Sequence, residues 1–168
     1  MYNYKFYDKI KYMKKKVFIW SLLFVFLDQL SKILLNNFLV VNKSYEIFAK
    51  FLYINVTYND GISFSMLGGQ RVLIILISLI IMFVLFRYMK TFKENKKNIL
   101  AFALIYGGLF GNLIDRIVYG YVIDFLDFYV LSYDAPIFNL ADSFICIGIG
   151  LLLYAVIKGE DSESSGTK

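Results

Sequence analysis

Four long apolar runs alternate with polar connections along this chain. The runs cover residues 17–40, 71–89, 98–117 and 138–158. Each is long enough to cross the hydrocarbon core of a bilayer as a helix, which takes about 20 residues. The second run is the cleanest, because from Val72 to Phe86 it carries no charge and only Ser78 is polar. The pattern therefore predicts four transmembrane helices.

The segment 42–70, between the first two runs, has a different pattern. Residues 51–58 are rich in aromatic and β-branched residues, with polar positions at Asn55 and Thr57, which favours a strand. The residues 59–61, Asn-Asp-Gly, form a turn signal. We predict a small sheet outside the membrane here. Residues 61–65 could line a groove that binds an extended peptide by strand addition, and a plain connecting loop explains the same residues equally well.

Composition supports the membrane assignment. Of the 168 residues, 59% are apolar and 19% aromatic, and there is one proline. A soluble domain of this size could not cover so much apolar surface with so few polar residues. The predicted fold class is an all-α membrane protein with four transmembrane helices and a small extracytoplasmic β-cradle between helices 1 and 2. Residues 1–158 form one predicted domain, and the acidic, serine-rich residues 159–168 are predicted to be a disordered cytoplasmic tail.

The net charge of +5 is explained by membrane topology. Lysines gather before the first run and in the connection 87–97, at the ends of apolar runs and not among exposed aromatic residues. Positive-inside anchoring explains this pattern better than nucleic-acid binding does, so we expect no nucleic-acid partner. The first run has no small-residue cleavage site, so we expect a retained helix and not a cleaved signal peptide. Both termini are then predicted to be cytoplasmic.

Histidine is absent, and Cys146 is the only cysteine. These two facts remove Ser-His-Asp and Cys-His catalysis, histidine or thiolate zinc sites, and a disulfide framework. We therefore predict no metal and no cofactor.

Ionisable groups within apolar runs are candidates for function, since each costs about 2.5 kcal/mol or more at a helix centre. Asp28 and Lys32 stand four residues apart on one helix face. They could form a salt bridge that makes insertion tolerable, or brace a polar site at the outer end. Asn112 and Arg116 also share a face. Arg116 could belong to a site or merely extend to the interface.

Residues 118–137 are predicted to be an outer loop, because they contain three aspartates, several aromatic residues and no lysine. Pro136 keeps the residue before it out of helical geometry, so the fourth helix can begin near residues 137–139 and hold Asp142 in its first turns. The topology then gathers five polar residues near the outer membrane face: Asp115, Arg116, Asp124, Asn139 and Asp142.

Two carboxylates at one site can share a proton and hydrolyse a peptide bond, one activating water while the other polarises the carbonyl. Asp142, near a helix N-terminus, is expected to hold the charge. Asp124, in an aromatic loop, is expected to hold the proton. Asn112, Asn139 and Arg116 could orient the pair. The alternative is that these aspartates only cap helices and bind loop amides.

Five ordered blocks of the sequence resemble the lipoprotein signal peptidases (signal peptidase II), which are bacterial inner-membrane aspartyl proteases. The blocks are Asp-Gln-Leu-Ser-Lys at 28–32, Asn-Asp-Gly-Ile-Ser-Phe-Ser at 59–65, Gly-Gly-Leu-Phe-Gly-Asn-Leu-Ile-Asp-Arg at 107–116, Val-Ile-Asp-Phe at 122–125 and Phe-Asn-Leu-Ala-Asp-Ser at 138–143. The similarity covers residues 17–158 in order and spacing.

This resemblance implies that Asp124 and Asp142 are catalytic. It implies supporting or substrate-contacting roles for Asp28, Lys32, Asn59, Gly61, Asn112, Arg116 and Asn139. It also implies that the chain removes signal peptides from diacylglyceryl-modified prolipoproteins just before the lipidated cysteine, in contact with membrane lipid, and is inhibited by globomycin. The rival hypothesis is a small transporter or proton-relay protein that uses the same carboxylates.

Overall fold

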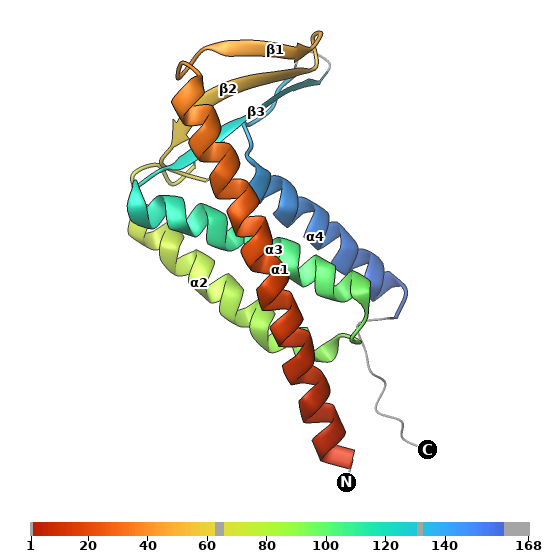
Figure 1. The fold of residues 1–168 in the computed structure, drawn as a ribbon. Coiled ribbons are helices and arrows are strands. Elements are labelled where there is room, and N and C mark those ends of the chain that lie inside the picture. Colours follow the sequence, from red (N-terminus) through yellow and green to blue (C-terminus); the bar gives the residue numbers. More distant parts are fainter. Residues whose placement is uncertain (1, 63–65, 131–132, 160–168) are drawn as a thin grey trace.

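Within residues 2–62, 66–130 and 133–159, which the computed structural model describes, the chain forms four long helices and one small sheet (Figure 1). The helices are α1 (Tyr2–Phe38), α2 (Arg71–Tyr88), α3 (Lys96–Val118) and α4 (Leu140–Ile157). A short 3₁₀ turn, η2 (Met89–Thr91), follows α2. All four helices are long and apolar enough to cross a membrane, the first from Tyr12 onward. The predicted fold class is confirmed, although α1 begins earlier than the Val17 expected.

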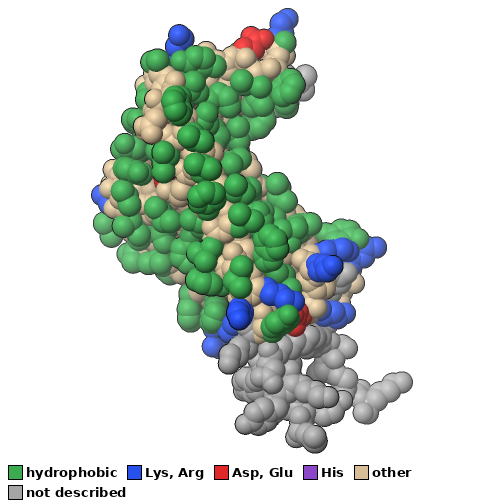
Figure 2. Space-filling model, in the orientation of Figure 1, with side chains coloured by type: hydrophobic (Ala, Val, Ile, Leu, Met, Phe, Trp, Pro, Cys, Tyr) green, Lys and Arg blue, Asp and Glu red, His purple; other side chains and the backbone are tan. Residues whose placement is uncertain are grey.

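Helix α3 is the centre of the bundle. About 78% of its most apolar window is buried, against 17–22% in each of the other three helices. In Figure 1 α1 crosses α3, with α2 and α4 on either side. Large apolar side chains such as Phe18, Val72 and Phe83 remain exposed on the outer helices, and Figure 2 shows apolar side chains over most of the visible face. Such a surface suits contact with lipid and not with water.

Glycines on α3 allow its neighbours to approach closely. A Cβ at Gly107 would lie 2.5 Å from the Cβ of Phe24 on α1, and one at Gly108 would collide with the carbonyl oxygen of Ala141 on α4. Small residues at such contacts let helix backbones pack closely in membranes, where no hydrophobic force drives helices together. The Gly107-x-x-x-Gly111 pattern therefore brings the polar residues of α1, α3 and α4 within hydrogen-bonding distance.

The sheet lies at one end of the helices (Figure 1). Its antiparallel strands are β1 (Ser44–Phe48), β2 (Leu52–Asn59), β3 (Val122–Val130) and β4 (Tyr133–Asp134), in that order. The strands expected in residues 42–70 are present. The expectation of an outer loop over 118–137 misses a strand, since β3 pairs along β2 and places Asp124 opposite Thr57. Residues 122–125 are all buried, so β3 lacks the alternation that marks a half-exposed strand.

Candidate active site

Asp124 lies near the start of β3 and is almost fully buried, with 3% of its surface exposed. One carboxylate oxygen accepts a hydrogen bond from the side-chain amide of Asn139 at 2.6 Å, and the other accepts one from Asn59 at 2.9 Å. Asn59 is the last residue of β2, and its side-chain oxygen Oδ1 accepts the backbone N–H of Gly61 at 3.0 Å. Strand pairing between β2 and β3 therefore sets the position of this carboxyl group.

Asp142 lies in the first turn of α4 and belongs to a capping box with Asn139. The Asn139 side chain accepts the backbone N–H of Asp142 at 2.9 Å, and the Asp142 carboxylate accepts the backbone N–H of Asn139 at 3.2 Å. Such a reciprocal pair satisfies amide groups that a helix start otherwise leaves free. The prediction that Asp142 sits at a helix N-terminus is confirmed, and the capping alternative describes part of what this residue does.

Two asparagines connect the aspartates to each other. Asn139 donates to Asp124 and, at 3.0 Å, to the side-chain oxygen of Asn112. Asn112 in turn donates to the Asp142 carboxylate at 2.8 Å. Asp124 and Asp142 line the same cavity, about 270 Å³ in volume, together with Asn59, Asn112 and Arg116. Its remaining lining is mostly apolar and comes from α2, α3, α4 and β3 and from the connections that hold Ile62, Leu67 and residues 136–138. The cavity therefore has one polar end, where both carboxyl groups lie.

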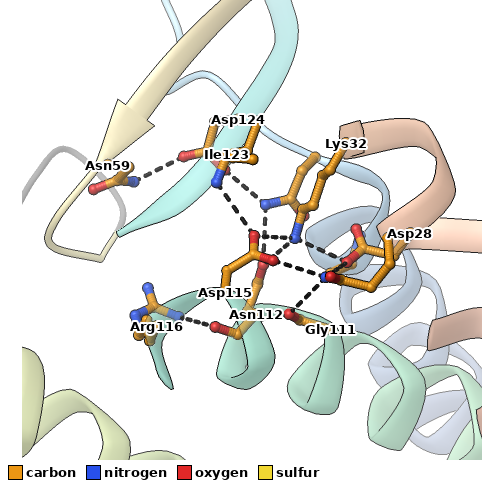
Figure 3. A network of polar contacts seen from close by, with 12 residues as sticks. Asp28, Lys32, Asn59, Gly111, Asn112, Asp115, Arg116, Ile123 and Asp124 are labelled. Atoms are coloured by element: carbon orange, nitrogen blue, oxygen red, sulfur yellow. Dashed lines mark hydrogen bonds and ion pairs between the residues drawn. The ribbon is translucent and has the colours of Figure 1, made fainter. Parts of the chain in front are cut away.

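A buried ionic cluster lies beside this polar end and contacts Asn112 (Figure 3). The Lys32 ammonium lies 2.8 Å from Asp28 and 2.9 Å from Asp115, and it donates to Asn112 at 3.0 Å. Lys32 is only 1% exposed. The other oxygen of Asp28 accepts the backbone N–H of Ala141 on α4 at 2.9 Å. Asp28 and Lys32 thus form the expected salt bridge and also brace the site, so both alternatives hold together.

Asp115 ties α3 to the sheet, because it accepts the backbone N–H of Ile123 at 3.2 Å. Gln29 completes the cluster: its amide donates to Asp115 at 2.7 Å and to the carbonyl of Gly111 at 3.2 Å. Gln29 belongs to the motif at residues 28–32, but the motif alone predicts no role for it. Its signal was a polar residue beside Asp28 in an apolar helix, a place where polar side chains face protein and not lipid.

Arg116 does not extend to the interface, since it is 8% exposed. Its guanidinium donates to the carbonyl oxygen of Gly61 at 2.7 Å and to that of Asn112 at 3.4 Å. Its Nε has no hydrogen-bond partner among the described residues. Arg116 therefore holds the start of the connection after β2 against α3. Of the groove expected along residues 61–65, residues 63–65 lie outside the part of the chain that the structure describes.

The electrostatic setting of Asp124 favours its neutral form. Burial, followed by the nearby charge of Asp142, raises the pKa of Asp124 to about 7, against an ordinary value of 3.8. The hydrogen bonds from Asn59 and Asn139 act in the opposite direction and are weaker. A carboxyl group with this pKa can hold or release a proton near neutral pH, as an acid–base catalyst must.

The chain matches a family of known proteins over most of its length. Residues 20–158 match the family model described as Signal peptidase (SPase) II. A lipoprotein signal peptidase of Staphylococcus carnosus (strain TM300) is 36% identical over 151 residues, covering 86% of this chain and 95% of the relative. One from Alteromonas mediterranea is 40% identical over 155 residues, covering 88% and 84%.

A solved structure has the same fold. It is a bacterial membrane enzyme determined by the in meso method at 2.3 Å resolution, with a TM-score of 0.76 and 31% sequence identity. The match covers 90% of this chain and 91% of that one.

Proposed function

Because the chain belongs to the signal peptidase II family, we propose that it is an aspartic endopeptidase of the membrane. Its substrates are diacylglyceryl-modified prolipoproteins, and it cleaves just before the lipidated cysteine. The observation that carries the proposal is one cavity lined by two carboxyl groups, Asp124 and Asp142. Asn139 donates to the first and Asn112 to the second, and the two asparagines are hydrogen-bonded to each other.

The two aspartates have different roles in this proposal. Asp142 holds the charge, supported by its place in the first turn of α4, where the helix dipole favours an anion. Asp124 holds the proton, supported by the burial that raises its pKa to about 7. The ionised Asp142 takes a proton from a water molecule, whose oxygen then bonds to the scissile carbonyl carbon.

Asp124 polarises the carbonyl oxygen as that carbon becomes tetrahedral. When the C–N bond breaks, Asp124 gives its proton to the leaving amine. Asp142 then carries the proton taken from water, and transfer of a proton between the two carboxyl groups restores the starting state. Asn112 and Asn139 already hold both carboxyl groups in place, so these groups need no reorganisation during the reaction. Arg116, with its Nε lacking a partner among the described residues, donates to a substrate carbonyl.

The supporting residues hold the two carboxyl groups in this arrangement at a buried site. Lys32 pairs with both Asp28 and Asp115, and the cluster fixes Asn112 and the start of α4. Asn59 fixes Asp124, and Gly61 provides the carbonyl that Arg116 binds. The aliphatic part of the cavity between α2, α3 and α4 receives the substrate's apolar residues.

A lipid-anchored substrate is already confined to the bilayer, so much of the entropy of positioning is lost before it reaches the cavity. We place the protein in the bacterial inner membrane, with both termini cytoplasmic and the cavity at the extracytoplasmic face, because its basic residues gather at the opposite end. The cyclic peptide globomycin inhibits by occupying the same cavity.

The test is cleavage of a purified diacylglyceryl-modified prolipoprotein, followed as a shortened product on a gel. The intact protein should cleave it, and globomycin should stop the cleavage. Asp124→Asn and Asp142→Asn should each still bind the substrate but lose about 10²–10⁴-fold in rate, the range for a lost acid–base group.

Asp127→Asn is the matched control, because Asp127 is also a buried aspartate of β3 but does not line the cavity. This variant should retain cleavage. Full activity in the Asp124→Asn or the Asp142→Asn variant would refute the catalytic assignment. Transport of protons or solutes that depends on Asp124 and Asp142, without proteolysis, would favour the rival hypothesis of a small transporter or proton-relay protein.

A further inference from the structure

A second concave surface lies at the basic end of the helices, far from the carboxylates in sequence and structure. It is a groove of about 410 Å³ between α1 and α3, called here the α1–α3 groove. Its lining includes Lys16, Trp20, Leu23, Phe24, Lys96 and Leu100. The mechanism proposed above uses none of these residues.

The sequence builds the groove from two similar helix faces. On α1, Lys16 is followed four residues later by Trp20 and then by Phe24, so that a basic group stands at the end of an apolar stripe. On α3, Lys96 is followed by Ile99 and Leu100 in the same way. Both helices therefore contribute a lysine at the end of the membrane-spanning segment and apolar side chains within it.

The charges at the mouth of the groove are unbalanced. The Lys16 ammonium lies 3.4 Å from the carboxylate of Glu94 and 4.0 Å from the centre of the Tyr12 ring. The first turn of α3 contains Lys96 and Lys97 and no acidic residue. The partial positive charge of a helix N-terminus adds to these lysines and does not oppose them. Lys16 and Lys96 line the groove and Glu94 is the acidic residue paired with Lys16, so the charged end of the groove has a net positive charge next to its apolar lining. Figure 2 shows basic side chains gathered at this end of the molecule.

We propose that the α1–α3 groove binds one anionic phospholipid, with an acyl chain along the apolar floor and the phosphate between Lys16 and Lys96. A phosphodiester supplies the negative charge that the mouth lacks. A signal-peptide segment fits less well, because basic residues precede its apolar part and would meet the two lysines. A second copy of the chain would bring the same positive mouth to the contact. The inference does not depend on the peptidase activity.

The chain itself contains the probe for a test. Trp20 is the only tryptophan, it lines the groove, and it is half exposed. The full chain is reconstituted in phosphatidylcholine vesicles that contain an increasing fraction of brominated phosphatidylglycerol or of brominated phosphatidylcholine. Bromine on an acyl chain quenches tryptophan fluorescence on contact. The anionic lipid should quench at a mole fraction about fivefold lower, the preference expected for one net charge near a membrane surface.

Three variants make the test specific. Lys16→Gln combined with Lys96→Gln should abolish the preference, and Glu94→Gln should increase it. The matched control, Lys43→Gln combined with Lys50→Gln, removes two lysines from the sheet end and should leave the preference unchanged. Equal quenching by the two lipids in the unaltered chain would overturn the proposal. So would a preference that survives loss of both groove lysines, since it would then come from the overall charge.

Discussion

At the scale of single residues, the site depends on two aspartates with different surroundings. Asp124 is enclosed on a strand and held by two amide donors. Asp142 is partly buried at a helix start and bonds to backbone N–H and amide groups that favour its charge. Chemically identical side chains can therefore take unequal shares of one proton. The enclosure of Asp124 has a cost in stability, which depends on pH.

The pKa of Asp124 predicts how stability changes with pH. In the folded chain this pKa is raised to about 7 from 3.8. Between these values the folded state keeps a proton that the unfolded state has lost, so the free energy of unfolding falls as pH rises from about 4 to about 7. Asp124→Asn resembles the neutral acid and avoids this loss. We expect it to be more stable than the unaltered chain at pH 8, by on the order of a few kcal/mol.

Thermal unfolding in detergent at pH 4.5 and pH 8 measures this difference. The advantage of Asp124→Asn should be large at pH 8 and should shrink toward pH 4.5. An advantage of equal size at both values would mean that packing or hydrogen bonding, and not titration of Asp124, is responsible.

At the scale of elements, ionic contacts join α1, α3 and α4 at the end where the cavity lies. Lys32 of α1 contacts Asp115 of α3, and Asp28 of α1 binds the first turn of α4 through Ala141. A Cβ at Gly111 would collide with the Asp28 carboxylate, so the glycine makes room for the cluster. Breaking a buried ionic cluster on one side leaves an uncompensated charge and is strongly destabilising.

Lys32→Met should therefore lower the free energy of unfolding by about 3–5 kcal/mol, because Asp28 and Asp115 would be left facing each other without a cation. Adding Asp28→Asn and Asp115→Asn to this variant should recover most of the stability, since no buried charge then remains. Denaturation in detergent gives both values. If the cluster also positions Asn112, the triple variant should be stable again but should not recover cleavage. A stable single Lys32→Met variant would contradict the assigned role of the cluster.

At the scale of the whole molecule, the two ends of the bundle differ in charge and in structure. The sheet and the cavity lie at one end, and the basic connection between α2 and α3 lies at the other. Lysine and arginine are retained on the cytoplasmic side of a membrane. We therefore propose that the two ends face opposite compartments, with the cavity open to substrate on the side of the sheet.

Labelling with a membrane-impermeant thiol reagent tests this orientation. In a Cys146→Ala background, a cysteine at Lys50, between β1 and β2, should react in intact spheroplasts. A cysteine at Lys93, between η2 and α3, should react only after the membrane is opened. Reaction at Lys93 in intact spheroplasts, with Lys50 protected, would reverse the proposed topology.

Features that depend on neighbouring residues can be predicted from the amino-acid order. Membrane helices follow from the length and hydropathy of each run, so all four were predicted. The start of α4 also follows from local chemistry, because Asn139 and Asp142 cap the same helix turn. The five motif blocks identified the polar residues that meet at the cavity, although residue spacing alone does not say which side chains touch.

Features that arise from contacts between distant segments become visible in the folded chain alone. The strand β3 forms because it pairs with β2, which lies more than sixty residues earlier in the chain. Residues 122–125 of β3 are all buried, so the strand lacks the alternation of polar and apolar residues that would have indicated it. Gln29 gains its role from Asp115, and Arg116 stays inside because Gly61 accepts its hydrogen bond. The physical reason is that a buried polar group must find a partner, and folding chooses which one lies within reach.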